Sequence, residues 1–438
     1  MERFSSLISL LEAQHPKGIA FEFFNKNRIN RISFESLLKE IKNYSLPREE
    51  CIGLFLTNTF SELVTFFALV GKRQIVILDP NEDPNLLIKK IKKTHISKLL
   101  GDYDEMDELI PHLEKAHKIE KTNILFFTSG TTDEAKAVML TEHNLCSATY
   151  NGGSLLPLTK EDKLLSVLPF SHIFGLVCSL LWPLSFGATV CLSGGIRSIF
   201  TDFNLFKPTV TSLVPEMAKF LVFNNIFNPQ LKLILIGAGS CDDMTLKAIK
   251  DKGIRLSYGY GLTETSSGIA LSLGDNPRAM TICPDYKVEI ASDNEIIVYS
   301  DHTLMEGYYE DEESTKKVLD NNRLATGDLG KIIDGYLFIT GRKKEILVFS
   351  DGSKLYIPEY ENKLMSYLGD GNDFTILQNK KGQIILYINK PQNVEKMVDE
   401  FNKTQTRSHQ IEKIVYSKTP LPRGKTGKIK KYLINLEE

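Results

Sequence analysis

The chain has 438 residues, of which 42% are hydrophobic and 25% charged, and its formal net charge at pH 7 is −2. This length predicts two or three domains, and the composition is ordinary for a globular enzyme. Because a nearly neutral chain has no overall positive field to attract a phosphate backbone, we expect no nucleic-acid partner.

The cysteines and the apolar segments indicate the cellular compartment. The six cysteines form no C-x-x-C pair and most lie in apolar runs, which indicates buried free thiols and not a disulfide framework or a zinc site. The N-terminal MERFSSLISLLE contains acids and does not resemble a signal peptide. The longest apolar run, Leu176–Leu192, is interrupted by Pro183 and Gly187 and is short for a membrane span. We therefore expect a cytoplasmic protein without a transmembrane segment, and leave peripheral membrane contact and the oligomeric state open.

Short apolar strands alternate with helical patterns through the first 250 residues. The predicted strands are Cys51–Thr57, Gln74–Leu78, Ser97–Leu100, Asn123–Thr128, Lys163–Leu168, Ala188–Leu192, Thr209–Val214 and Leu231–Ile236. The predicted helices are Thr59–Val70, Asp83–Thr94, Tyr103–His117, Glu142–Asn151, Pro215–Phe223 and Asp242–Asp251. Repeated β-α-β units with short loops predict an α/β fold with a mainly parallel sheet covered on both faces.

The pattern changes after about Asp275. Short strands with turn residues between them are predicted at Lys287–Ile290, Glu295–Tyr299, Leu329–Ile333 and Tyr336–Ile339. Further strands are predicted at Ile346–Phe349, Phe374–Leu377 and Ile384–Ile388, with helices near Pro358–Tyr367 and Asn393–Asn402. The predicted organisation is an N-terminal domain over residues 1–342, with a β-rich subdomain over about 276–342, hinged to a small α+β domain over 343–438.

The stretch from Asn123 to Val138 is the strongest candidate for a phosphate site. An apolar strand leads into Thr128–Thr132, which holds four hydroxyls and one glycine, and Lys136 follows. Gly130 allows close backbone approach to an anion, and the hydroxyls and the ammonium can donate to phosphate oxygens. The alternative is a solvated turn between two strands. The common P-loop pattern G-x-x-x-x-G-K-[ST] is absent around this stretch.

Further clusters carry polar groups at strand ends. His172 follows Leu168 in an apolar setting, where a buried structural histidine is the alternative. Gly237-Ala238-Gly239 follows a strand, where an ordinary strand-to-helix turn is the alternative. The stretch Tyr258-Gly259-Tyr260-Gly261 offers a flat surface for a planar base.

Hard oxygen ligands and fixed charges complete the candidate site. Thr263 and Glu264 suit a phosphate and a Mg²⁺ ion. Asp328 can accept from ribose hydroxyls unless it is a solvent-facing turn residue. Arg342 supplies a guanidinium fork, with a surface salt bridge as the alternative. The glycine-broken cationic stretch Leu421–Lys431 can deliver a lysine to a distant phosphate or form a solvated basic patch.

Together and in this order, the motifs T-S-G-T-T…K, Y-G-L-T-E, T-G-D, G-R-K-K-E-I and T-G-K-I resemble those of the adenylate-forming (AMP-binding) superfamily. This superfamily contains acyl-CoA synthetases, adenylation domains of peptide synthetases, and luciferases. The resemblance covers nearly the whole chain, and two longer strings, T-S-G-T-T-x-x-A-K-A-V-M-L-T and G-R-K-K-E-I-L-V, look most like bacterial fatty-acyl-CoA synthetases.

The resemblance implies a two-step ligase reaction. A carboxylic acid, expected to be apolar and fatty-acid-like, would react with Mg·ATP to give acyl-AMP and pyrophosphate. The thiol of CoA, or the phosphopantetheine of an acyl carrier protein, would then displace AMP. Positioning one anion against another makes charge screening and alignment the main catalytic requirements.

The same resemblance implies the role of each motif residue. The β- and γ-phosphates would be held by Thr128, Ser129, Gly130, Thr131, Thr132 and Lys136. Mg²⁺ would be bound by Thr128 and Glu264, the α-phosphate by Thr263, and ribose and phosphate by Asp328 and Arg342. The adenine would be framed by Gly237, Ala238, Gly239, Tyr258, Gly259, Tyr260 and Gly261. Lys428 would bridge the carboxylate and the α-phosphate, His172 would line the acyl pocket, and Lys344 would be the hinge.

The chain departs from the usual pattern of the family in its phosphate loop. Asp133, Ala135 and Ala137 stand where Gly, Pro and Gly are usual. Because carboxylates beside a triphosphate would repel it, Asp133 and Glu134 are expected to point to solvent. Two alternatives to CoA ligation stay open: a ligase that loads an acyl carrier protein, and a non-catalytic acyl or nucleotide sensor.

Overall fold

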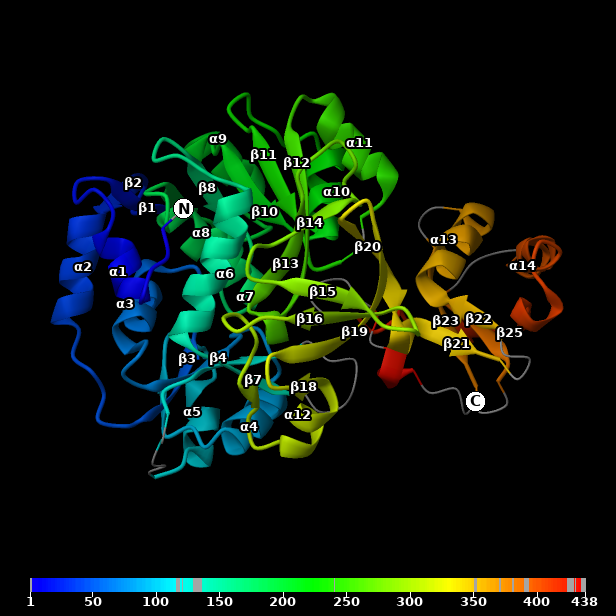
Figure 1. The fold of residues 1–438 in the computed structure, drawn as a ribbon, viewed down its shortest axis with the longest axis horizontal. Coiled ribbons are helices and arrows are strands. Elements are labelled where there is room, and N and C mark those ends of the chain that lie inside the picture. Colours follow the sequence, from blue (N-terminus) through cyan, green and yellow to red (C-terminus); the bar gives the residue numbers. More distant parts are fainter. Residues whose placement is uncertain are drawn as a thin grey trace.

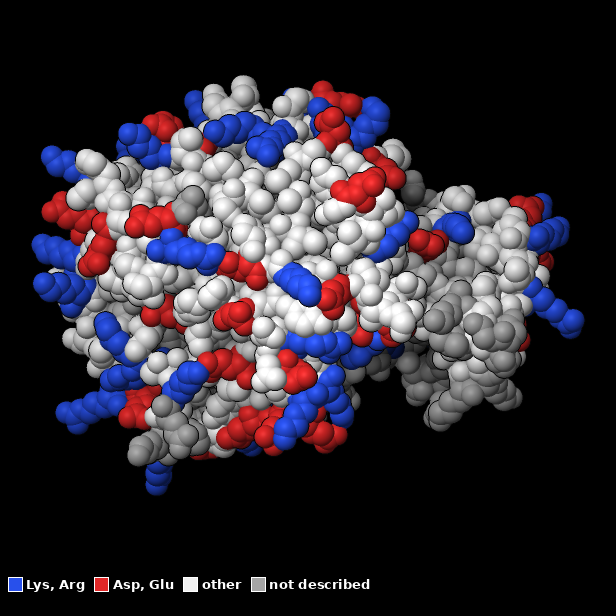
Figure 2. All heavy atoms as spheres, viewed as in Figure 1, with Lys and Arg blue, Asp and Glu red and all other residues white. Residues whose placement is uncertain are grey.

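The computed structural model describes residues 2–115, 119, 121–128, 136–239, 241–349, 353–369, 372–379, 382–389, 394–423, 429 and 431–434. It is a mixed α/β structure with two large sheets and a smaller unit at its C-terminal end (Figure 1). On the face shown in Figure 2, cationic and anionic side chains are interspersed over most of the surface. Within the described part of the chain, no helix combines the length and apolarity needed to cross a membrane.

The smaller of the two large sheets carries the predicted phosphate stretch. Its strand order is β17-β7-β6-β4-β3-β5, in which β3 to β6 are parallel and β7 and β17 are antiparallel to their neighbours. Its strands are β3 (Cys51–Phe55), β4 (Gln74–Leu78), β5 (Lys98–Leu100), β6 (Ile124–Phe127), β7 (Ala137–Leu140) and β17 (Gly307–Tyr308). Every residue of β3 and β4 is buried, as expected for parallel strands covered on both faces.

The larger sheet has 14 strands, and six adjacent ones are parallel in the order β1-β9-β8-β10-β11-β12. Its N-terminal part comprises β1 (Ile19–Asn25), β2 (Arg28–Ser33), β8 (Lys163–Ser166), β9 (Thr189–Leu192), β10 (Val210–Leu213) and β11 (Leu233–Ile236). The remaining strands are β12 (Arg255–Leu262), β13 (Ser267–Ser272), β14 (Met280–Ile282), β15 (Lys287–Ile290), β16 (Glu295–Tyr299), β18 (Leu319–Asp320), β19 (Arg323–Ile333) and β20 (Tyr336–Arg342).

Strand β12 explains why one predicted mainly parallel sheet becomes a mixed one. Its first half pairs in parallel with β11, and Gly259–Leu262 pair antiparallel with β13. From β13 the ladder continues through β14 to β20, where Met280 pairs with Leu337. The strands predicted in the β-rich subdomain over about 276–342 are therefore joined by hydrogen bonds to the larger sheet, and the subdomain itself stays a prediction.

Helices cover these sheets. Those in the first half of the chain are α1 (Leu7–Glu12), α2 (Phe34–Asn43), α3 (Phe60–Leu69), α4 (Pro84–Lys93), α5 (Met106–Leu109), α6 (Glu142–Leu155), α7 (Ile173–Leu176), α8 (Trp182–Leu184) and α9 (Ile199–Phe206). They are followed by α10 (Pro215–Phe223), α11 (Asp243–Asp251) and α12 (Glu312–Val318), while a π-helical turn, η2 (Val177–Leu181), joins α7 to α8. The single helix predicted at Tyr103–His117 is wrong: in the described part of this range, residues 103–115, the short α5 and one 3₁₀ turn, η1 (Ile110–His112), form instead. Pro111 lies at the start of that turn and cannot donate a helical hydrogen bond.

The C-terminal α+β unit has a hydrophobic core of its own. Strands β21 (Ile346–Val348) and β22 (Lys354–Tyr356) form a hairpin, and β23 (Asp373–Gln378), β24 (Ile384–Asn389) and β25 (Ile411–Ser417) form a three-stranded sheet. Helices α13 (Ile357–Leu368) and α14 (Val394–Asn402) pack on it through buried residues that include Leu364, Ile376 and Phe401. In Figure 1 this unit lies beyond β19 and β20. The domain boundary at 342/343 stays a prediction.

The six cysteines are all free thiols, and Cys178 is the one that is not fully buried. Burial raises the pKa of Cys178 to about 11, although a hydrogen bond with Ser267 opposes the shift. Burial also raises the pKa of Cys146 to about 12.

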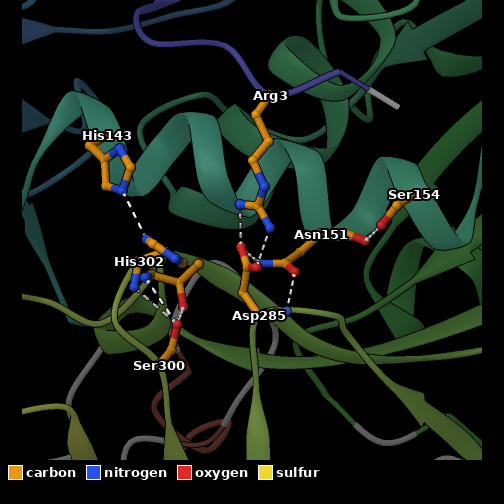
Figure 3. Close-up of polar contacts among 8 residues, drawn as sticks. Arg3, His143, Asn151, Ser154, Asp285, Ser300 and His302 are labelled. Atoms are coloured by element: carbon orange, nitrogen blue, oxygen red, sulfur yellow. Dashed lines mark hydrogen bonds and ion pairs between the residues drawn. The ribbon is translucent and has the colours of Figure 1, made fainter.

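A polar cluster fastens the N-terminal segment and α6 to the loops that flank β15 and β16 (Figure 3). The Arg3 guanidinium donates twice to the carboxylate of Asp285 and lies 3.8 Å from the ring centroid of Tyr150. The backbone N–H of Asp285 donates to Asn151 Oδ1 at 2.9 Å, and the Asn151 amide donates back to the carboxylate at 3.3 Å. Nearby, Nε2 of His143 lies 3.3 Å from Nδ1 of His302. These contacts hold the segment that supports the candidate site described below.

We expect Asp285→Ala to lower the free energy of unfolding by about 1–3 kcal/mol. The Asp285 carboxylate is only 6% exposed, and its removal leaves the donors of Arg3 and Asn151 without their acceptor. Urea unfolding followed by circular dichroism measures the change. Asp243→Ala is the matched control, since its pair with Arg278 is exposed on both sides and should contribute less than about 1 kcal/mol. Equal losses in the two variants would contradict a special role for Asp285.

Candidate functional site

The base of the predicted phosphate loop is the antiparallel pair of strands β6 and β7. Phe127 pairs with Ala137, and the backbone N–H of Thr128 donates to the carbonyl of Lys136 at 3.0 Å. This pairing holds Thr128 and Lys136 opposite each other at the carboxyl end of β6, where ligands bind in parallel α/β sheets. Ser129, Gly130, Thr131, Thr132, Asp133, Glu134 and Ala135 lie outside the described residues.

The stretch from Tyr258 to Glu264 runs along the second half of β12 into a 3₁₀ turn, η3 (Thr263–Thr265). The ladder shifts register between Tyr260 and Gly261, and the turn closes with Ser266 and Ser267 at positive φ. A Cβ on Gly261 would lie 1.6 Å from the carbonyl oxygen of Ser267, so only glycine fits this position. The glycine therefore permits the close backbone crossing that presents Thr263 and Glu264.

Two of the residue sets predicted around adenine meet in the structure. Gly237-Ala238-Gly239 directly follows β11, and the Tyr258 hydroxyl donates to the carbonyl of Gly239. Ala238 adopts the left-handed conformation with φ of 65°, which few non-glycine residues adopt. Burial raises the pKa of Tyr258 above its ordinary value, so this hydroxyl stays protonated as a donor. Their role toward adenine stays a prediction.

Asp328 and Tyr260 are buried and form a polar centre with Arg342, whose side chain is 40% exposed. Asp328 and Arg342 are register partners on β19 and β20, and the Arg342 guanidinium donates to both carboxylate oxygens of Asp328. The Tyr260 hydroxyl donates to Oδ2 of Asp328 at 2.9 Å. Because Asp328 is only 5% exposed, the alternative of a solvent-facing turn aspartate is wrong. Burial and the Asp328 charge raise the pKa of Tyr260. Burial opposes ionisation of Arg342, but its hydrogen bond to Asp328 raises its pKa overall.

Glu264 and Lys136 are connected through Tyr308, a residue outside the predicted motifs. The Tyr308 hydroxyl donates to Oε1 of Glu264 at 2.8 Å, and the Lys136 ammonium lies 4.4 Å from the centroid of its ring. The Glu264 carbonyl accepts from the backbone N–H of Met305 at 2.9 Å, and this hydrogen bond fixes the backbone of the turn. Only its place after Gly307 distinguishes Tyr308 in the sequence, and that signal is weak.

His172 lies at the N-terminal end of α7, with 44% of its side chain exposed. The alternative of a buried core histidine is therefore wrong. Its Nε2 is 4.0 Å from Oδ2 of Asp79, a buried residue at the end of β4. The amide of Asn58 donates to the carbonyls of Ser166 and Leu168 and braces the loop before His172. Neither Asp79 nor Asn58 belongs to a predicted motif.

The remaining predicted residues lie toward the C-terminal unit. Lys344 is exposed in a 3₁₀ turn, η4 (Lys343–Glu345), directly after β20. Its neighbour Lys343 pairs with Asp293 and with Glu295, each at 2.6 Å. Lys428 lies outside the described residues. No cluster of three or more His, Cys, Asp or Glu side chains suited to a metal occurs in the described ranges.

Comparison with protein families and relatives gives a consistent result. Residues 49–309 match the family described as AMP-binding enzyme. A 2-succinylbenzoate–CoA ligase from Listeria monocytogenes is 25% identical, over 89% of this chain and 84% of that protein. A long-chain-fatty-acid–CoA ligase from Mycobacterium tuberculosis is 26% identical, over 71% of this chain and 66% of that protein.

Solved structures show the same fold. O-succinylbenzoate coenzyme A synthetase from Bacillus subtilis, in complex with AMP, aligns with a TM-score of 0.85 and 22% identity, over 100% of this chain and 99% of that one. The same protein in complex with ATP and magnesium aligns with a TM-score of 0.83 and 21% identity, over 99% of both chains. At this identity the likeness establishes the fold alone.

We expect Gly261→Ala to destabilise the protein by about 3 kcal/mol or more, because its methyl group would collide with backbone that cannot move without breaking the β12–β13 ladder. The matched control is Gly268→Ala, since Gly268 is the register partner of Gly261 and a Cβ there meets nothing within 4 Å. Thermal unfolding of both variants provides the measurement. A Gly261→Ala protein as stable as Gly268→Ala would contradict the predicted collision.

Proposed function

Because this chain belongs to the AMP-binding enzyme family, we propose that it joins a carboxylic acid to a thiol through an acyl-adenylate. A carboxylate oxygen attacks the α-phosphorus of ATP, and the bond to the β-phosphate breaks with pyrophosphate as the leaving group. A thiolate sulfur then attacks the acyl carbon, and AMP leaves. The superfamily and the enzyme class predicted from the motifs are confirmed by the family match.

The observation that best supports this proposal is the contact set along one short segment. Tyr258 contacts the glycine turn after β11, Tyr260 contacts Asp328, and Glu264 is linked through Tyr308 to Lys136. An adenosine triphosphate needs a flat surface for its base, polar groups for its ribose, and cations for its phosphates. This segment offers these groups in that order.

Mg²⁺ fits the donor set at Glu264. One carboxylate oxygen of Glu264 accepts from Tyr308, and no described residue donates a hydrogen bond to the other, Oε2. A carboxylate and the Thr128 hydroxyl are hard oxygen ligands, and Mg²⁺ in nucleotide sites takes most of its other ligands from phosphate and water. The ion would screen the charge between the incoming carboxylate and the triphosphate.

Four residues would orient the reactants. Asp328 would accept from ribose hydroxyls with the lone pairs that Tyr260 and Arg342 leave free. Lys136 would place its ammonium at the outer phosphates, and Thr263 would donate to the α-phosphate. His172 would face the acyl group. Its ring is exposed after the loop that follows β8, and Phe174 from the same turn packs against Gly237, in the segment proposed to frame adenine.

The identity of the acid is the finer part of the proposal. The motif likeness favours an apolar, fatty-acid-like substrate, and one of the relatives named above acts on long-chain fatty acids. Another is a 2-succinylbenzoate–CoA ligase, which favours an acid with an aromatic ring. Both relatives use CoA, so we propose CoA as the acceptor, with an acyl carrier protein as the alternative acceptor. An acyl or nucleotide sensor without catalysis is the alternative from another class.

A panel of fatty and aromatic carboxylic acids, with Mg·ATP, should yield acyl-AMP and pyrophosphate in the absence of any thiol. Pyrophosphate release and mass spectrometry of the adenylate provide the measurement, repeated with CoA and with a carrier protein to identify the acceptor. Release of ADP and phosphate would refute the proposed chemistry, and binding of ATP without turnover of any acid would favour the sensor.

Lys428→Ala should nearly abolish acyl-AMP formation while leaving thioester formation from synthetic acyl-AMP. The lysine would stabilise the negative charge that develops at the α-phosphate, and losing one such donor lowers the rate by a factor of about 10²–10³. Lys344→Pro fixes φ at the proposed hinge and should have the opposite pattern. Both half-reactions are measured for both variants. If Lys428→Ala slows both steps equally, the proposal that Lys344 is a hinge, about which the C-terminal domain turns between the two steps, loses its main support.

A further inference from the structure

Tyr308 occupies the space between the two oppositely charged groups of the candidate phosphate site. Its hydroxyl end contacts Glu264 Oε1 at 2.8 Å, and its ring faces the Lys136 ammonium at 4.4 Å. No direct ion pair joins Lys136 to Glu264, although the structure describes both side chains. Opposite charges attract, and a direct ion pair between them would neutralise both groups.

The backbone around Tyr308 is fixed from both sides. Strand β17 pairs Tyr308 with Val138, two residues beyond Lys136. The Tyr308 N–H donates to Oγ1 of Thr315 at 2.9 Å, from helix α12. Gly307 has a φ of 140°, and a Cβ there would lie 2.9 Å from Thr315, so the approach of α12 requires glycine.

The side chain is fixed as well. Tyr308 is 7% exposed and belongs to the main hydrophobic core. The Tyr308 hydroxyl acts as a donor toward the carboxylate of Glu264. A rigid donor at Oε1 determines the direction in which Oε2 points.

We propose that Tyr308 is a positioning residue for the metal-bound triphosphate. Its hydroxyl aims the free oxygen of Glu264 at the metal, and its ring keeps Lys136 apart from Glu264 so that the ammonium stays available to phosphate. This inference rests on the proposed function, and it assigns separate tasks to the two ends of one side chain. Removing the hydroxyl alone should therefore affect the metal, and removing the ring should also affect the nucleotide.

The test is calorimetric binding of an ATP analogue that cannot be cleaved between its α- and β-phosphates, with Mg²⁺ titrated and with Mg²⁺ removed by chelation. Tyr308→Phe should raise the Mg²⁺ concentration for half-maximal binding by about ten-fold or more, the loss expected for a hydrogen bond to a charged group. Its binding of the metal-free analogue should equal that of the wild type. Tyr308→Leu should weaken metal-free binding too, because Lys136 can then pair with Glu264.

Tyr299→Phe is the matched control, since the exposed Tyr299 hydroxyl donates to Oε2 of Glu289 at 2.9 Å and should affect neither measurement. An unchanged Mg²⁺ requirement in Tyr308→Phe, or equal weakening with and without Mg²⁺, would overturn the inference. Tyr308→Phe retains the buried ring, so the test does not depend on whether Tyr308→Leu folds. Because binding is measured without an acid, failure of the proposed ligase reaction is detected separately, in the acid panel.

Discussion

The change of pairing partner along β12 is the constraint on which the candidate site depends. A strand that is parallel to β11 in its first half and antiparallel to β13 in its second half must cross other backbone at close range. Gly261 permits that crossing, because no side chain fits between β12 and the Ser267 carbonyl. The turn that follows then presents Thr263 and Glu264 at the edge where Thr128 and Lys136 also lie. The candidate site therefore lies where the parallel strands end and the β19–β20 ladder begins.

Residues far apart in the chain support this point. The Tyr286 hydroxyl donates to the carbonyl of Thr265, and the Ser266 hydroxyl donates to the carbonyl of Thr303. The cluster around Asp285 and His302 fastens these segments to α6 (Figure 3). Hydrogen bonds to Thr265 and Ser266 thus hold the end of the turn in place, and Thr263 and Glu264 at its start are the residues proposed to contact the ligand.

Much of this arrangement was predictable from the sequence, because continuous motifs carry local geometry. The strand before Thr128 and the glycine-aromatic stretch at Tyr258 were located by apolar runs and turn residues. The antiparallel pairing of β12 with β13 was not predictable, since sequence periodicity reports which face is buried and not which strand is the neighbour. The helix expected at Tyr103–His117 failed because Pro111 interrupts an otherwise suitable pattern. Tyr308 escaped detection since its partners are 44 and 172 residues away in the chain.

The burial of the thiols has a consequence for an enzyme that generates activated acyl groups. An acyl-adenylate acylates any thiolate that reaches it, including those of the protein that made it. Cys178 lies one helical turn after Phe174, close to where the acyl group would lie, and burial keeps it protonated with a pKa near 11. The other five cysteines are fully buried. In the proposed reaction, burial of these thiols would oppose self-acylation and favour transfer to the thiol that enters from solution.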